Sequence, residues 1–161
     1  MLCVMDNKVE EKKISYSLFG VHLLSFQVNN IQIGHNTLPE LFYNYNGTLL
    51  LSQDNENLIA TDTTIIVSAK LNNSEEHQEI GSIKTRCEFL LNNIDVYKKN
   101  NKQFEIANIP EQLLGSFLSI AASTTRGMLL IKGYGTLLST QVFPIMDMVP
   151  IIKSLHKTTL K

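Results

Sequence analysis

The segment from Asn108 to Lys132 reads NIPEQLLGSFLSIAASTTRGMLLIK and has the apolar periodicity of one long helix. Asn108 is a residue type that caps helices, and Pro110 suits a first turn because it lacks a backbone N–H. Glu111 favours the positive end of the helix dipole. We therefore predict that a helix begins at this point and continues to Lys132.

The residues of this helix separate into two faces. One face has small side chains and a single charge, and consists of Gly115, Ser119, Ala122, Ser123 and Arg126. The wider face is apolar and consists of Leu114, Phe117, Leu118, Ala121, Met128 and Leu129. So few charges predict that most of the helix is covered, and periodicity alone leaves open whether the cover is the chain's own sheet, another subunit or a client.

Glycines punctuate the helix and the segment after it. Gly115 and Gly127 each cost about 1 kcal/mol relative to alanine inside a helix, which favours a break or a close packing contact there. The glycines of residues 133–135 are expected to end the helix. Residues 136–144 are uncharged and predict an extended connecting loop, and residues 145–152 predict a short C-terminal helix with a proline in its first turn.

The first half of the chain alternates with a period of two, which is typical of strands with one buried face and one wet face. We predict four antiparallel strands near residues 18–33, 43–53, 57–72 and 79–91. Strands followed by helices predict an α+β fold: a four-stranded antiparallel sheet, a long helix packed on one face of it, an extended loop and a short final helix.

Composition indicates one domain over residues 1–161, with flexible ends at 1–13 and 156–161. The chain has 161 residues, of which 43% are hydrophobic and 18% are charged, and its net charge is -1. This balance gives no reason to expect nucleic acid as a partner. The sequence shows no window suited to a transmembrane helix, so no membrane insertion is expected. Two distant cysteines, Cys3 and Cys87, and a start without signal-peptide features predict a cytoplasmic location.

Catalytic and metal-binding patterns are missing from the sequence. The histidines lack ligand spacing, and no Cys-x-x-Cys or phosphate-binding glycine loop is present. Gly133-Tyr134-Gly135 follows a helix rather than a strand, so it does not point N–H groups at a phosphate. We therefore expect no enzyme activity, no metal and no cofactor. Arg126 either pairs across a subunit boundary or reaches solvent, and the sequence does not choose between these alternatives.

The order of elements, four strands, a capped helix and an apolar loop ending in proline, resembles the SecB family of export chaperones and their SecB-like relatives. Three local segments are similar to that family. Leu24–Asn29 (LSFQVN) looks like its first strand, Glu111–Gly115 (EQLLG) like the opening of its helical half, and Gly135–Ile145 like its connecting loop.

The resemblance implies a homotetramer, organised as a dimer of dimers, whose hydrophobic grooves hold unfolded polypeptides. It assigns the oligomer interface to the small-residue face of the helix, Gly115, Ser119, Ala122, Ser123 and Arg126. It assigns peptide binding to residues of the first strand, the helix and the loop. These are Leu24, Phe26, Phe117, Leu118, Ala121, Leu129, Leu137, Leu138, Val142 and Phe143.

Two functions follow from this resemblance. The first is an ATP-independent holdase for unfolded or precursor polypeptides, serving protein export or a dedicated client. The alternative is a structural, adaptor or toxin–antitoxin-associated module that binds one partner. Well-studied export chaperones of the family are strongly acidic and contact the translocase motor SecA through their tail. This chain is nearly neutral and ends in the basic segment 153–161, which argues against docking on SecA.

Overall fold

Four long strands form one antiparallel sheet in the computed structural model, which describes residues 15–29, 39–70, 76–97, 105–106, 109–140, 143–145 and 149. The strands are β1 (Ser15–Val28), β2 (Leu41–Leu51), β3 (Leu58–Lys70) and β4 (His77–Asn92), in the order β1-β4-β3-β2. A single long helix, α1 (Glu111–Lys132), follows them in this part of the chain. The predicted α+β fold, with a four-stranded antiparallel sheet and one long helix, is confirmed.

The observed strand bounds differ from the predicted ones by one to three residues, except at the end of β1. β1 begins at Ser15, earlier than predicted, and ends at Val28 rather than at residue 33. β1 pairs with β4 although the two strands are far apart in the sequence. The expected joints between β2, β3 and β4 connect strands that are neighbours in the sheet.

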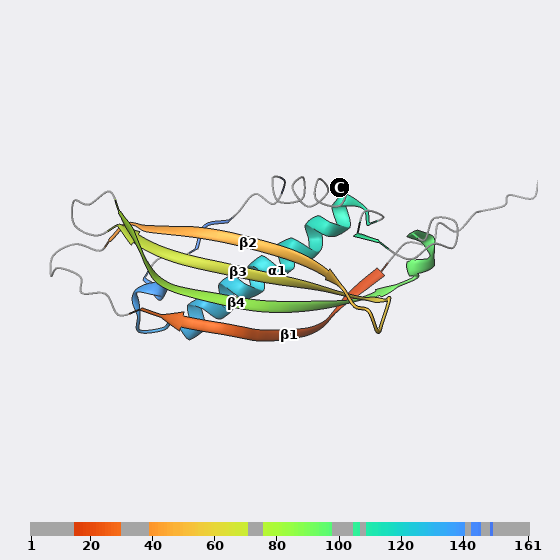
Figure 1. Ribbon diagram of the computed structural model, residues 1–161, viewed down its shortest axis with the longest axis horizontal. Coiled ribbons are helices and arrows are strands. Elements are labelled where there is room, and N and C mark those ends of the chain that lie inside the picture. The colour runs from red at the N-terminus through yellow and green to blue at the C-terminus, as the bar shows by residue number, and fades with distance from the viewer. Residues whose placement is uncertain are drawn as a thin grey trace, which may run out of the picture.

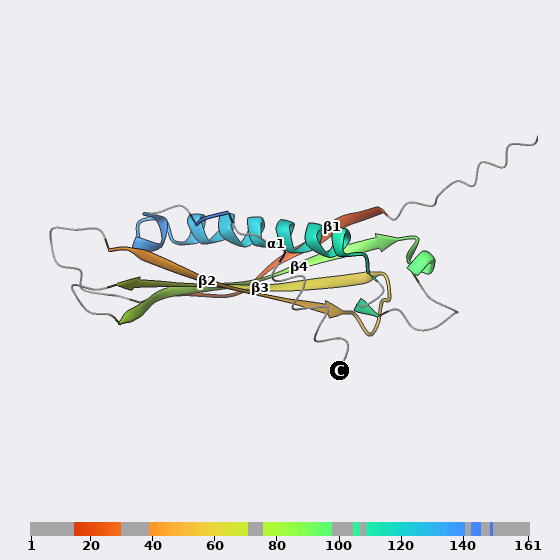
Figure 2. The ribbon, with the colours of Figure 1, turned by 90° about the horizontal axis from the view of Figure 1, so that it is seen from above.

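Buried and less buried side chains alternate along β3 and β4, and α1 covers the buried face. Ile59, Ile65, Val67 and Ala69 on β3 are fully buried, and residues opposite them on β4, such as Phe89, are fully buried too. The other face carries the charged Asp62, Lys84 and Arg86 together with partly buried apolar residues such as Ile66. Figure 2 shows α1 lying along one side of the sheet, and within the sheet it packs mainly against β3 and β4.

The helix starts later than an Asn108 cap predicts. Ile109 is not helical, and Pro110 precedes the first helical residue with an extended backbone (φ -57°, ψ 140°) and no side-chain cap. The residue before a proline is disfavoured in the α region, which explains why the helix cannot begin at Ile109. Asn108 itself lies outside the described residues.

The helix is continuous across both of its glycines, so the predicted break is wrong. A Cβ added to Gly127 would meet nothing within 4 Å, so the alternative of a close packing contact is also wrong there among the described residues. At the end of α1, Gly133 caps the helix and Gly135 has a positive φ of 79°, as the glycines predict.

The region after α1 differs from the prediction in its first part. Residues Leu137–Ser139 form a short 3-10 turn, η4, in place of the predicted extended loop. Thr136 causes this turn, because its hydroxyl accepts a hydrogen bond from the Leu138 N–H at 3.2 Å. Most of the predicted helix at 145–152 lies outside the described residues; within it, Ile145 is not helical and Val149 is.

By length and composition α1 could cross a membrane, contrary to the sequence prediction, since it has 22 residues and a mean hydropathy of 1.3 over its most apolar window. Seven of its residues are nevertheless buried, from Leu114 to Leu129. These residues pack against the sheet, as the core helix of an α+β domain does.

The core beneath α1 consists of two apolar clusters separated by threonines. One cluster contains Phe89 and Phe117, whose rings stack with centroids 4.6 Å apart. The other contains Ile65, Leu129 and Leu138. A polar layer lies between the two clusters, and we call it the threonine layer. It consists of the fully buried Thr61, Thr63, Thr85 and Thr125.

The threonine layer joins α1 to the sheet by hydrogen bonds. The Thr85 and Thr125 hydroxyl oxygens lie 2.6 Å apart, and the Thr125 hydroxyl donates to the Ala121 carbonyl at 2.7 Å. Because Thr125 has one O–H, which it gives to Ala121, Thr85 is the donor of the shorter bond. Within the described residues, the hydroxyls of Thr61, Thr63 and Tyr45 have no hydrogen-bond partner.

Candidate functional site: a groove beside the long helix

A groove runs along one side of α1, between the helix and the segment Phe143–Ile145. Its volume is about 250 Å³. The lining residues are Ser119, Ala122, Ser123, Arg126, Phe143, Pro144 and Ile145. We call this the helix groove.

The helix wall of the groove follows from helical spacing. Ser119, Ala122, Ser123 and Arg126 are three or four residues apart, so they share one face of α1. Their small side chains leave room beside the helix, which larger residues would fill. Four of the five residues predicted for the oligomer interface therefore line the groove; Gly115 does not.

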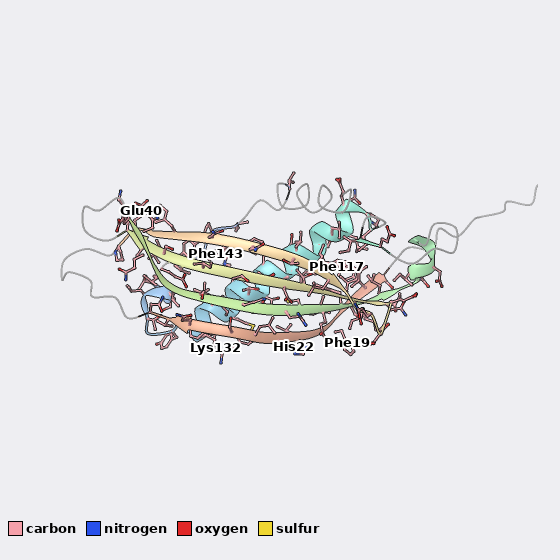
Figure 3. All side chains as sticks on the ribbon, viewed as in Figure 1. Phe19, His22, Glu40, Phe117, Lys132 and Phe143 are labelled. Atoms are coloured by element: carbon pink, nitrogen blue, oxygen red, sulfur yellow. The ribbon has the colours of Figure 1, made fainter. Side chains whose placement is uncertain are left out.

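The opposite wall is apolar and is anchored in the core by Phe143. Phe143 is 3% exposed and packs edge-on against Tyr43 of β2, with ring centroids 4.9 Å apart. Pro144 and Ile145 follow it at the surface, and Ile145 is 90% exposed. The segment thus inserts one side chain into the core and leaves the next two at the rim of the groove. Figure 3 shows Phe143 near β2 and Phe117 toward the start of α1.

The turn after α1 is fixed by Leu138. This side chain is 1% exposed, and its neighbours include two glycines. A Cβ on Gly81 of β4 would lie 2.8 Å from the Leu138 Cδ1 atom, and a Cβ on Gly133 would lie 2.8 Å from its Cβ. Added side chains would collide with Leu138, so glycine at both positions is what lets the loop pack on the sheet.

A second hollow of about 190 Å³ lies where this turn meets the sheet. It is lined by Val28, Asn29, Ile80 and residues 135–138. Leu137, predicted to bind peptide, contributes to this hollow and is partly buried. The two hollows are lined by different residues, so they are separate candidate sites.

A third feature is an exposed apolar surface on β1. Leu18, Val21 and Leu23 pair with Phe89, Cys87 and Thr85, so they point to the same side of the sheet as α1. Their partners are fully buried, yet these three side chains are 46%, 39% and 38% exposed. In the view of Figure 1, α1 crosses the sheet obliquely and does not run along β1.

Two irregularities add further apolar side chains to β1. Register shifts occur between Leu18 and Gly20 and between Leu23 and Ser25. The residues inside them are Phe19, 66% exposed, and Leu24, 43% exposed. We call Leu18, Phe19, Val21, Leu23 and Leu24 the β1 surface. Figure 3 shows Phe19 and His22 along this outer strand.

The structure buries most of the residues predicted to bind peptide. Phe117, Leu118, Ala121 and Leu129 are at most 1% exposed and pack on the sheet, so in this conformation they are core residues that a client cannot contact. This corrects the prediction: periodicity identifies an apolar helix face, but this chain's own sheet covers it. Leu138 and Phe143 are nearly as buried and reach only the margins of the two hollows.

The other residues predicted to bind peptide do not share one site. Phe26 is partly buried against the core, and Leu24 is exposed on the β1 surface. Val142 lies outside the described residues. Sequence reasoning missed Pro144 and Ile145 as groove residues, and it missed Leu18, Phe19, Val21 and Leu23 as an exposed surface. One sequence feature could have indicated the exposed surface on β1: its 14 residues contain no Asp, Glu, Lys, Arg or Pro, the residues that usually protect an edge strand.

Electrostatic features are concentrated on the sheet face away from α1. Arg86 donates two hydrogen bonds to Asp62, at 2.7 and 3.0 Å, and Lys84 lies 3.7 Å from the same carboxylate. The Arg86 hydrogen bond holds the pKa of Asp62 below its usual range. His22 lies 3.2 Å from Glu88 on this face. These groups cross-link β1, β3 and β4.

Other titratable groups lie inside the core. Burial raises the pKa of the Cys87 thiol, a rise that a hydrogen bond with Thr124 opposes. Burial also raises the pKa of the Tyr45 hydroxyl. Within the part of the chain that the structure describes, no three His, Cys, Asp or Glu side chains gather as a metal site would require.

Comparisons with known proteins identify the fold. No protein-family model and no curated protein matches the sequence. Among solved structures, the chain is similar to the SecB-like chaperone Rv1957 of Mycobacterium tuberculosis, in complex with a ChAD peptide from the antitoxin HigA1 (Rv1956). The match has a TM-score of 0.51 at 9% sequence identity and covers 81% of this chain and 90% of that one. The chain therefore has a SecB-like α+β fold.

Proposed function

We propose that this protein is an ATP-independent chaperone that binds extended segments of unfolded polypeptides in the helix groove. The observation that carries the proposal is the groove itself, which has an apolar wall on one side and two serine hydroxyls and the Arg126 guanidinium on the other. Unfolded chains present apolar side chains together with backbone groups that need hydrogen bonds, and such a channel can satisfy both.

Binding alone is sufficient for this activity. A protein that binds unfolded chains and not folded ones lowers the concentration of free, aggregation-prone chains by mass action. The fold-level similarity supports a peptide ligand, since the similar mycobacterial protein carries one. The proposed setting is the cytoplasm, where clients are met before they fold.

We further propose that copies of the chain assemble through the β1 surface. Five apolar side chains on one edge strand form a patch of the kind that normally marks an interface. Within the described ranges β1 is an edge strand with no neighbour on its outer side, and two such edges can pair in a two-fold arrangement. A homotetramer would then need a second contact, outside the helix groove.

The second candidate function is an adaptor that binds one partner, such as an antitoxin. The supporting observation is the similar mycobacterial structure, in which a SecB-like chaperone is in complex with a peptide from an antitoxin. The two functions predict different ligand ranges. A general holdase binds many unrelated unfolded proteins, and an adaptor binds one sequence.

An aggregation assay with groove variants tests the leading proposal. Ile145→Asp and Ser123→Trp alter the groove at exposed positions, the first by adding charge and the second by filling space. Both should abolish the delay in aggregation of an unfolded model protein while leaving the melting temperature unchanged. Ile131→Asp is a matched control, because Ile131 is 76% exposed on the same helix and does not line the groove.

Two outcomes of this assay contradict the proposal. If both groove variants protect the model protein as well as the parent does, the groove is not the client site. If the parent protects no unfolded protein tested, the holdase function is wrong, and capture of a single partner becomes the function to pursue.

A further inference from the structure

Arg126 is the one charged residue among those described that line the helix groove. The other charges on α1 are near its ends, at Glu111 and Lys132. None of the ion pairs or hydrogen bonds found among the described residues involves the Arg126 guanidinium. Its side chain is of intermediate burial, so this part of the chain holds a partly desolvated cation in the groove without a paired anion.

The surroundings of Arg126 suit a carboxylate. A guanidinium binds a carboxylate through two parallel hydrogen bonds, and this interaction strengthens where water is partly excluded. Ser119 and Ser123 lie on the same helix face, seven and three residues before Arg126, and their exposed hydroxyls can donate further hydrogen bonds. The described groove residues include no acidic side chain that would compete.

The size of the groove limits what accompanies the carboxylate. Its volume of about 250 Å³ is below the range of roughly 300–1,000 Å³ typical of small-molecule sites. The apolar wall of Phe143, Pro144 and Ile145 faces the serine and arginine wall. The space therefore suits one or two side chains of an extended peptide, with an apolar side chain on one wall and a carboxylate on the other.

We propose that the helix groove selects extended peptide segments in which an acidic residue neighbours an apolar one, with Arg126 as the anion-binding residue. This inference rests on the proposed peptide-binding function and specifies its ligand. It gives Arg126 a carboxylate as its partner, whereas the sequence alone leaves a choice between a subunit contact and solvent. It also predicts that unfolded clients rich in lysine next to apolar residues bind poorly.

Fluorescence anisotropy with three labelled peptides tests this inference. The peptides share length and apolar residues and carry Glu, Gln or Lys at one position beside a leucine. The parent protein should bind the Glu peptide about 5- to 10-fold more tightly than the Gln peptide, as expected for a partly buried charge-assisted pair. The Lys peptide should bind most weakly, and the preference for Glu should shrink as salt is added.

Substitutions of Arg126 complete the test. Arg126→Gln should make the Glu and Gln peptides bind equally, and Arg126→Glu should reverse the order in favour of Lys. Arg126→Lys keeps the charge but loses the planar fork, so it should retain part of the preference. Melting temperatures of all three should match that of the parent, because Arg126 makes no ion pair or hydrogen bond with the described residues that they would remove.

The possible results separate this inference from the proposed function. Equal affinity of the parent for all three peptides would overturn the acidic preference while leaving peptide binding intact. No binding of any peptide would overturn both. If Arg126→Gln changes the oligomeric state and leaves the peptide preference unchanged, Arg126 is a subunit contact and the inference is wrong.

Discussion

The two sides of α1 have similar apolar strands beneath them but differ in what covers those strands. On the β2 side, Phe143 packs against Tyr43 and is 3% exposed. On the β1 side, Val21 and Leu23 point to the same side of the sheet as α1 and remain more than a third exposed. The chain thus closes its core on one side with its own loop. On the other side it leaves apolar side chains exposed.

This difference separates stability from association. Residues on the closed side should contribute to the free energy of unfolding of one chain, and residues on the open side should contribute to contacts between chains. Substitutions on each side, and in the core between them, test whether the two roles are separate.

The largest expected effect is at Phe143. Phe143→Ala removes a buried ring from the closed side and should lower the free energy of unfolding by about 3 kcal/mol, within the range for buried phenylalanines. Ile145→Ala, two residues away and 90% exposed, should change it by less than about 0.5 kcal/mol. Chemical denaturation measures both. A loss below about 1 kcal/mol for Phe143→Ala would mean that the loop does not close the core.

Substitutions on the open side, at the β1 surface, should weaken the association between chains. The double variant Val21→Ser, Leu23→Ser removes apolar area from the β1 surface and should weaken self-association at least about 10-fold, the equivalent of about 1.4 kcal/mol. Sedimentation velocity over a dilution series measures the effect. Asn44→Ser and Asn46→Ser on β2, both at exposed positions on the opposite edge strand, provide a matched control. Unchanged association of the β1 variant would show that this surface is not the interface.

The threonine layer should show a smaller and strongly coupled effect. Thr125→Val leaves the buried Thr85 hydroxyl without its acceptor and should cost about 1–2 kcal/mol of unfolding free energy. The double variant with Thr85→Val should cost less than the single one, because both polar groups are gone. Thr61→Val removes a hydroxyl that has no partner among the described residues and should be neutral or stabilising. Additive losses in this cycle would mean that the two hydroxyls do not interact.

The smallest effect concerns pH and lies on the face of the sheet away from α1. The pKa of Asp62 is lower in the folded protein than in an unfolded chain, because Arg86 donates hydrogen bonds to its carboxylate. The pair's contribution is therefore complete above the unfolded pKa of about 4 and is lost as the pH falls through the lower, folded value. We expect a loss of about 1 kcal/mol from this pair.

Comparison with Asp62→Asn isolates that contribution. The variant should be less stable than the parent near neutral pH, and the difference should disappear at acid pH, as measured by urea denaturation at several pH values. A difference that stays constant down to the most acid pH tested would show that the carboxylate's ionisation is not what stabilises the sheet.

The sequence predicts the layers of this fold because its periodicities are local. Alternation along β3, with Ile65, Val67 and Ala69 on one face, reports which face is buried, and helical spacing along α1 reports its apolar stripe. Pairing of β1 with β4 is a long-range contact, and no local pattern encodes it. The helix starts later than predicted because Pro110 restricts the residue before it, which outweighs the capping preference of Asn108.

The candidate site was predictable only in part. The spacing of Ser119, Ala122, Ser123 and Arg126 groups them on one face, and the structure places that face along a groove. Hydrophobicity could not say whether Phe117 or Leu118 would meet a client or the sheet, because both possibilities require the same apolar stripe. The exposure of Val21 depends on the oblique path of α1, which is a tertiary property (Figure 1).

Site-specific cross-linking tests the central claim most directly. A photoactivatable side chain at Ser123, inside the helix groove, should cross-link to an unfolded client, and the same group at Ile131, on the same helix outside the groove, should not. Both positions are exposed, so neither label should disturb the fold. Equal cross-linking at the two positions, or cross-linking at Ile131 alone, would contradict the assignment of the helix groove as the place where unfolded chains bind.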